Sequence, residues 1–268
     1  MIPFKEILRS YPRIFVVLQK FSRVRRALKN LGLMPIRLSR LIRLLRYFKE
    51  WITFKRKGGS IHFTFPIVTD YNDSAGVASG HYFHQDLLVA QYIHENSPIR
   101  HIDIGSRIDG FVAHVASFRK IEVFDIRTLK NLDHPNIEYS QVDLMSGADV
   151  EITDSLSCLH AIEHFGLGRY DDPITPLGHL LGFKNLIKML KPGGTLYISF
   201  PIGSANEVHF NAHRVFHPKD ILTWAPNELI LSSFDFVDDF GNLHKNIDLS
   251  NFDPLVTYGC GIYTFRKI

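Results

Sequence analysis

The feature that most constrains the fold is an alternation of short apolar stretches with helical patterns. Apolar runs of strand length lie at 100–104, 121–124, 137–142, 155–159 and 195–200. Helical patterns lie at 84–96, 110–118 and 177–190. Alternation of this kind indicates a mostly parallel sheet with helices on both faces. The sequence therefore predicts an α/β fold with a doubly wound sheet.

The C-terminal part of the chain lacks this alternation. Residues 229–237 and 261–266 form two further strand patterns, and the polar loop between them has no helical pattern. Two strands joined in this way are most simply paired antiparallel at the edge of the sheet. With the five strands before them, they complete a predicted sheet of seven strands.

Charge divides the chain into two unlike parts. Residues 1–57 contain sixteen Lys and Arg residues and two acidic residues, which gives a net charge of +14. The rest of the chain has a net charge of −10, so that the total is +4. Lys57-Gly58-Gly59-Ser60 closes the basic part and is typical of a linker. We therefore expect a basic helical segment at 1–60 and a separate domain at 61–268.

The basic segment has three interpretations that the sequence leaves open. Arg37, Arg40, Arg43 and Arg46 recur at every third residue among Leu and Ile, which places a cationic stripe beside an apolar one. Such a helix can pack on the domain as a cap, lie on an anionic membrane surface, or bind nucleic acid. Few aromatic residues and no recognisable module make nucleic acid the least favoured partner.

Neither a signal peptide nor a membrane span is expected. The longest apolar run near the N-terminus, residues 14–18, is too short for either. The only two cysteines, Cys158 and Cys260, lie in apolar stretches, which argues against a disulfide scaffold and favours a reducing compartment. The expected location is the cytoplasm, at the inner face of a membrane if the basic segment binds lipid.

Acidic residues stand at the ends of three successive predicted strands. In a doubly wound sheet, ligands bind beyond the carboxyl ends of the strands. Asp125 lies twenty residues after Gly105, the spacing at which a carboxylate meets the hydroxyls of a ribose. Asp143 can accept a hydrogen bond from an adenine amino group. Asp103, Asp125 and Asp143 can each be a cap or a turn residue, but together they predict an adenosine site.

Further cofactor contacts are expected around these acids. They are the residues that follow the predicted strands or precede the first helix of the domain, where the chain can fold over a ligand: Gly105, Ser106, Asp109, Ile126, Leu144, His160, Tyr82 and His84.

Two stretches of the chain resemble class I S-adenosylmethionine-dependent methyltransferases. They are Leu190-Lys191-Pro192-Gly193-Gly194-Thr195-Leu196, a helix-to-strand turn, and Leu159-His160-Ala161-Ile162-Glu163-His164. More narrowly, GHYFHQDLLVA, DIGSRIDGFVAHVASF, GLGRYDDPI and FNAHRVF are similar to a little-characterised methyltransferase-like family of unknown function found in nematodes and bacteria. The resemblance covers about residues 80–268. It implies a Rossmann-like methyltransferase fold and S-adenosylmethionine as cofactor.

The first loop departs from the pattern of that superfamily. Asp103 and Gly105 match Asp-x-Gly-x-Gly-x-Gly, but Arg107 and Asp109 replace the next two glycines, and Gly110 comes one place late. S-adenosylmethionine has no pyrophosphate, so the backbone need not approach it as closely as a dinucleotide. We expect Arg107 and Asp109 either to address the charged methionine end or to brace each other.

Methyl transfer to a hydroxyl needs a general base, and histidine suits neutral pH. His213 is the first candidate, followed by His164 and His160, although each can instead have a structural role. The expected substrate contacts are Arg214, Asn211, His209, Arg169 and Asp171. No metal site is predicted; a divalent cation near Asp171 and Asp172 is the less favoured alternative.

These observations favour an S-adenosylmethionine-dependent O-methyltransferase acting on a saccharide or a related polar metabolite. A non-catalytic protein that binds S-adenosylmethionine is the first alternative, because the loop glycines are altered. A nucleic-acid methyltransferase is less favoured. Residues 159–161 read Leu-His-Ala where base-amino methylases carry an Asn/Asp-Pro-Pro-aromatic signature.

Overall fold

The structure is a computed structural model, and it describes residues 38–71, 73–252 and 256–268. Contacts within the chain divide it into two units, 1–76 and 77–268, which are described separately. The sequence places the boundary earlier, at the Gly-Gly pair that follows the basic helix.

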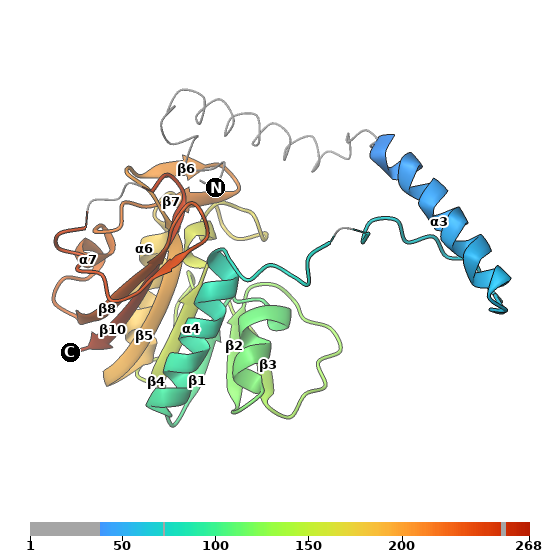
Figure 1. Cartoon of the computed structure of the whole chain (residues 1–268). Coiled ribbons are helices and arrows are strands. Elements are labelled where there is room, and N and C mark those ends of the chain that lie inside the picture. The colour runs from blue at the N-terminus through green and yellow to red at the C-terminus, as the bar shows by residue number, and fades with distance from the viewer. Residues whose placement is uncertain (1–37, 72, 253–255) are drawn as a thin grey trace. The chain divides into compact units, whose positions relative to one another are not determined.

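The first unit contains helix α3 (Leu38–Arg56) (Figure 1). Part of its cationic stripe is engaged within the unit. Arg43 donates to the carbonyl oxygens of Val68 and Thr69 at 3.2 and 3.1 Å. Arg46 forms an ion pair with Glu50 at 2.7 Å. Arg37 and the other residues up to 37 lie outside the described residues. No helix in the described ranges combines the length and the apolar character needed to cross a bilayer.

The second unit is built on an eight-stranded sheet with the strand order β3-β2-β1-β4-β5-β10-β8-β9. The parallel strands are β1 (His101–Ile104), β2 (Ile121–Asp125), β3 (Ile137–Gln141), β4 (Thr153–Leu159) and β5 (Leu190–Ile202). The antiparallel strands are β8 (Leu229–Val237), β9 (Leu243–His244) and β10 (Gly259–Lys267). The predicted fold class is confirmed, and the two-residue β9 is added to the seven predicted strands.

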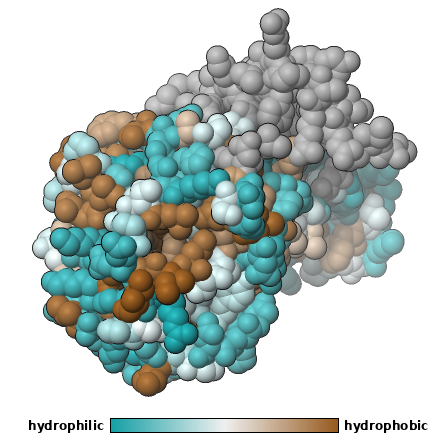
Figure 2. Space-filling model, turned by 90° about the vertical axis from the view of Figure 1, so that its left-hand side faces the viewer, coloured by the Kyte–Doolittle hydropathy of each residue, from teal (hydrophilic) through white to brown (hydrophobic). Residues whose placement is uncertain are grey.

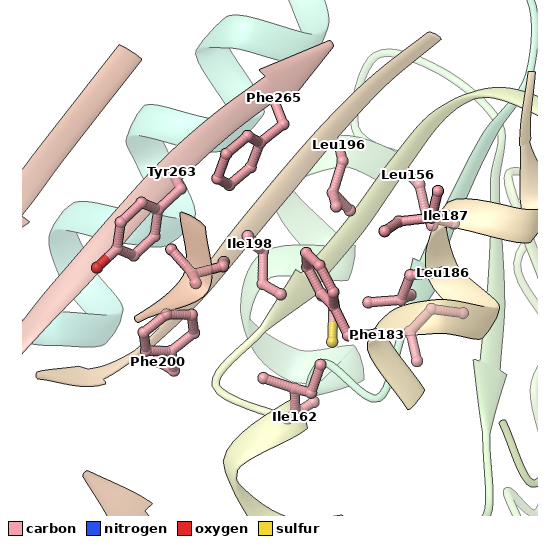
Figure 3. Packing of buried hydrophobic residues seen from close by; sticks show 14 of the residues in the cluster. Leu156, Ile162, Phe183, Leu186, Ile187, Leu196, Ile198, Phe200, Tyr263 and Phe265 are labelled. Carbon is pink, nitrogen blue, oxygen red and sulfur yellow. The ribbon is translucent and has the colours of Figure 1, made fainter. Parts of the chain in front are cut away.

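Helices cover both faces of the sheet. The longer ones are α4 (His81–Asn96), in front of the sheet in Figure 1, and α6 (Gly178–Met189) behind it. Successive residues of a strand point to opposite faces. Accordingly, Tyr197 belongs to the core cluster that contains the apolar face of α4, whereas Leu196 and Ile198 pack with the apolar face of α6 (Figure 3).

Two local elements differ from the sequence prediction. The helix expected at 110–118 begins earlier, as the distorted turn η1 (Ile108–Val112), and continues as α5 (Ala113–Ala116). Gly110 interrupts this turn with φ −122° and ψ −115°. The turn expected at 191–194 forms the start of β5 instead, where Gly193 has φ +74° and the pairing with β4 changes register.

A small hairpin lies at the upper end of the sheet in Figure 1, the end to which the parallel strands point. It consists of β6 (Glu207–His209) and β7 (His213–Val215). It is linked to the main sheet through a bridge between Ile202 and Phe216. Nearby are the short helices η2 (Ile162–His164), directly after β4, and α7 (Ile221–Trp224). This end therefore gathers the histidine-rich segments of the chain.

The outer strands carry a mixed surface. Figure 2 looks at the side of the molecule that bears α7 and the C-terminal strands, and shows apolar surface gathered in one area with hydrophilic surface around it.

Candidate functional site

Two adjoining cavities open at the carboxyl ends of the parallel strands. The smaller has a volume of about 50 Å³, and the larger has a volume of about 590 Å³. The residues that line both of them are Gly105, Arg127, His160, His164 and Tyr170. The two cavities therefore form one candidate site, at the edge of the sheet where doubly wound proteins bind ligands.

The smaller cavity brings together six of the predicted cofactor contacts, including Gly105 and His160, which line both cavities. Asp125 ends β2 and is 6% exposed, and Asp143 follows β3. Ile126 and Leu144 lie directly after these acids, and all four side chains line the cavity. The amide of Met145 donates to Asp143 Oδ1 at 2.9 Å, which fixes that carboxylate. Two carboxylates beside apolar side chains match the hydroxyls and the ring of an adenosine.

Arg127 occupies the boundary between the two cavities. Its Nε donates to Asp125 Oδ1 at 2.9 Å, and its terminal nitrogen pairs with Asp125 Oδ2. The same nitrogen donates to the carbonyl of Gly105 at 3.1 Å, and the guanidinium lies 4.8 Å from the centre of the Tyr170 ring. The carboxylate predicted to meet a ribose is thus already paired. Arg127 is not among the predicted contacts, although an arginine two residues after the acid is visible in the sequence.

Asp103 differs from the expectation. It is fully buried and lines neither cavity. Its carboxylate accepts hydrogen bonds from Ser106 Oγ at 2.8 Å, the Ser106 amide at 3.1 Å and Ser157 Oγ at 2.5 Å. Burial raises its pKa to about 7, against the lowering effect of these hydrogen bonds. Asp103 therefore holds the loop in shape and does not itself present a carboxylate to a ligand.

The loop after β1 also depends on Gly105. This residue has φ +75°, and a Cβ on it would lie 2.9 Å from the Cβ of Ala161. A side chain is thus excluded by both backbone and space. Ser106, Asp109 and Arg107 follow and line the larger cavity. Arg107 and Asp109 form an exposed ion pair at 2.7 Å, in agreement with the bracing alternative.

Glu163 stands at the centre of a buried histidine cluster. Its Oε1 lies 2.9 Å from Nδ1 of His160 and 3.6 Å from Nε2 of His164. Burial alone would raise the pKa of Glu163, but the charge of His160 and its hydrogen bond hold that pKa below its usual value. His160 has φ +48°, a left-handed conformation that costs about 1 kcal/mol or more for a residue other than glycine. Strained residues of this kind concentrate at functional sites.

His213 lies on the hairpin and lines the larger cavity. Its Nε2 is 3.2 Å from Nδ1 of His209, whose Nε2 is 2.6 Å from the Glu207 carboxylate. Burial, and then the neighbouring His209, lower the pKa of His213 to about 4. The ring is therefore neutral at neutral pH. Tyr82 and Arg169 line the same cavity.

Five other expected contacts line neither cavity, and one of them, His209, lies behind His213. Arg214 is 4% exposed and donates to the carbonyl of Phe165 at 2.6 Å, so it holds the loop after η2 in place. His84 Nε2 lies 3.0 Å from the carbonyl of Gly241, outside both linings. Asn211 and Asp171 are exposed and line neither cavity.

Asp172, the neighbour of Asp171, lines the smaller cavity instead. Its carboxylate accepts hydrogen bonds from the amides of Gly166, Gly168 and Tyr170 at 2.7, 3.2 and 3.1 Å. These backbone contacts occupy the carboxylate that the sequence offered as a cation ligand.

Solved structures with a similar fold are known. Coclaurine N-methyltransferase, crystallised with N-methylheliamine and SAH, matches with a TM-score of 0.51 and 10% identity over 92% of this chain and 99% of that chain. The cyclase SpnF matches with a TM-score of 0.49 and 14% identity, over 87% and 98%. The N-methyltransferase NodS of Bradyrhizobium japonicum matches with a TM-score of 0.48 and 13% identity, over 74% and 93%. The first of these shows that this chain has the fold of class I methyltransferases, as the sequence predicted.

A family model described as a Caenorhabditis protein of unknown function, DUF268, matches residues 140–257. This range includes η2, the hairpin β6–β7 and the loop between them. No curated protein matches the sequence.

Proposed function

We propose that the protein is an S-adenosylmethionine-dependent methyltransferase that methylates a hydroxyl of a saccharide or a related polar metabolite. The observation that carries the proposal is the pair of adjoining cavities at the carboxyl end of the sheet. One is lined by two carboxylates and apolar side chains, and the other by histidines and charged groups. Coclaurine N-methyltransferase, which has this fold, was crystallised with SAH.

The smaller cavity fits the adenosine part of the cofactor. Asp125 has the position from which a carboxylate reaches ribose hydroxyls, and Asp143 lies where an adenine amino group can donate to it. Arg127 lines this cavity and is paired with Asp125, the carboxylate that a ribose would contact. We therefore expect Arg127 to turn away as the ribose binds. When bound, S-adenosylmethionine supplies a methyl group on a positively charged sulfur, open to displacement by a nucleophile.

His213 is the histidine best placed to accept the proton of an acceptor hydroxyl. The Glu207 carboxylate can only accept, so a neutral His209 carries its proton on Nε2 and presents a lone pair on Nδ1. His213 then donates from Nε2 to that lone pair, and its own Nδ1 is left to accept. A proton taken up at Nδ1 can be relayed through His209 to Glu207, so the ring does not have to retain it.

The larger cavity suits a polar acceptor. Its volume of about 590 Å³ lies within the range of small-molecule sites. Carboxylate, guanidinium and amide groups line it, including those of Asp86, Arg169 and Gln85. A molecule with many hydroxyls can donate to the acids and accept from the arginine and the amide. This match favours a saccharide over an apolar acceptor.

A turnover assay tests this function. The protein is incubated with S-adenosylmethionine and a panel of saccharides, and the formation of S-adenosylhomocysteine and of methylated sugar is measured by mass spectrometry. His213→Gln should lower turnover about 100-fold or more, because it removes the base. His84→Gln is the matched control, since His84 faces Gly241 away from both cavities. The wild-type rate should be constant above about pH 5 and fall as His213 is protonated near pH 4.

Other results would change the assignment. Unchanged turnover in His213→Gln removes this residue as the base. Methylation of amines or nucleic acids in preference to sugars replaces the acceptor class. Binding of S-adenosylhomocysteine without turnover on any acceptor favours the non-catalytic alternative.

A further inference from the structure

Three side chains from distant parts of the sequence meet beside the larger cavity. They are His81 at the start of α4, His160 at the end of β4 and Cys260 in β10. Ring nitrogens of the two histidines and the sulfur of Cys260 all lie within 4.8 Å of one another. Among the described residues this is the one group of His, Cys and acidic side chains with the spacing of metal ligands.

His160 has one ring nitrogen held by a carboxylate and the other beside a thiol. Its side chain is 5% exposed, and Nδ1 lies 2.9 Å from Glu163 Oε1. Its Nε2 is buried and has no nitrogen or oxygen partner among the described residues, and the side chain interacts with that of Cys260. Histidines that bind metals are commonly held in this way, with a carboxylate on one nitrogen and the ion on the other. A buried ring nitrogen with a thiol and no oxygen beside it is poorly satisfied, so this atom points to a missing ligand.

His81 and Cys260 complete the group. The His81 ring stacks on that of His160 with 5.3 Å between centroids, and it hydrogen-bonds to the backbone of Tyr258. Cys260 is fully buried, and its sulfur lies 3.7 Å from oxygens of Gln85 and Gly261 and interacts with the His160 side chain. The second cysteine, Cys158, lies outside the group.

We propose that His81, His160 and Cys260 bind a Zn²⁺ ion, with Glu163 orienting His160. Two imidazoles and a thiolate are donors that Zn²⁺ takes, and three protein ligands leave the fourth position of a tetrahedral ion open. Of the three ligands, His160 lines the larger cavity together with Gln85 and Tyr258, so the site adjoins that cavity. An acceptor hydroxyl bound there would have its pKa lowered by the ion. That last role rests on the proposed function, whereas binding of the ion does not.

Metal binding by the full-length protein tests the proposal. After incubation with Zn²⁺ and dialysis, the wild type should retain about one ion per chain by elemental analysis. Co²⁺ in its place should give a near-ultraviolet absorption from thiolate-to-metal charge transfer, because one ligand is a thiolate. Cys260→Ser should abolish this absorption. Cys158→Ser should keep both the ion and the absorption, and it is a matched control because Cys158 is equally buried.

Glu163→Gln provides a test that leaves all three ligands in place. Losing the carboxylate beside His160 should weaken Co²⁺ binding about tenfold or more. Circular dichroism shows whether each variant folds. If Cys260→Ser does not fold, Glu163→Gln alone tests the metal site. Four results would each overturn the proposed metal site. They are no retained Zn²⁺ in the wild type, a Co²⁺ spectrum without the thiolate absorption, an equal loss of that absorption in Cys158→Ser, and a Co²⁺ affinity that is unchanged in Glu163→Gln. None of these readouts depends on methyl transfer, so failure of the proposed function is distinguishable from failure of the metal site.

Discussion

At the scale of single residues, Asp103 and Asp125 occupy neighbouring strands but have different surroundings. Asp125 lines the smaller cavity and forms an ion pair with Arg127. Asp103 is instead buried beneath the loop that follows β1 and accepts hydrogen bonds from two serines. The sequence could place both acids near the carboxyl ends of strands, because strand patterns are readable. It could not show which way each carboxylate turns. That is decided for Asp103 by Ser157, 54 residues away.

The cluster of His81, His160 and Cys260 was not predictable for the same reason. Metal sites are recognisable in a sequence when their ligands recur at short spacings. Here the ligands come from a helix and two strands that lie far apart in the chain. The only signal was a cysteine between two glycines, Gly259 and Gly261, directly before the strand predicted at 261–266.

The buried carboxyl of Asp103 predicts a particular pH dependence of stability. Its pKa is raised to about 7, so the folded protein keeps a proton that the unfolded chain releases near pH 4. The stabilisation that this retained proton gives the folded state is complete below about pH 4 and is lost as the pH rises toward 7. Asp103→Asn imitates the protonated form and should lose less stability over this range than the wild type. Urea unfolding at about pH 4.5 and about pH 7.5 measures the two free energies of unfolding. Parallel changes in wild type and variant would contradict the burial of this carboxylate.

At the scale of elements, the central strands were predictable and several connections were not. Strands β1 to β5, β8 and β10 have apolar patterns long enough to recognise in the sequence. The hairpin β6–β7 has strands of three residues each, too short for an alternating pattern, so the sequence indicated only a loop there. The hairpin matters for the site because it sets His209 opposite His213.

The loop after β2 gives a prediction about cofactor binding. In the free protein, Asp125 is paired with Arg127, and a ribose has to break that pair. Arg127→Ala should therefore bind S-adenosylhomocysteine about tenfold more tightly, equivalent to about 1.4 kcal/mol, and should be less stable without it. Arg119→Ala is a control, because Arg119 donates to the carbonyl of Pro98 outside both cavities. If calorimetry shows that Arg127→Ala binds S-adenosylhomocysteine no more tightly than the wild type, Arg127 does not compete with the ribose for Asp125.

At the scale of the whole molecule, the charge asymmetry and the two units raise the question of what the first unit binds. Several large apolar side chains of α3 are exposed, including Leu45 at 72% and Phe48 at 54%. The same helix carries Lys49, Lys55 and Arg56. Apolar and cationic side chains on one helix suit an anionic membrane surface, and we propose that the first unit binds one.

Vesicle binding tests this interpretation. The full-length protein should co-sediment with vesicles that contain phosphatidylserine, more weakly at high salt, and less with neutral vesicles. The double substitution Leu45→Ser and Phe48→Ser should weaken binding several-fold, whereas Thr53→Ser on the same helix should not change it. Equal binding to neutral and anionic vesicles, or none to either, would leave the cap or nucleic-acid interpretations.

The central claim is that the strand ends form an adenosine site in which Asp125 is a direct contact and Asp103 is not. Titration calorimetry with S-adenosylhomocysteine tests it most directly. We expect the wild type to bind, Asp125→Asn to bind about 10- to 100-fold more weakly through loss of charge-assisted hydrogen bonds, and Asp103→Asn to stay within about threefold of the wild type. No binding by the wild type, or an affinity unaffected by Asp125→Asn, would contradict the account.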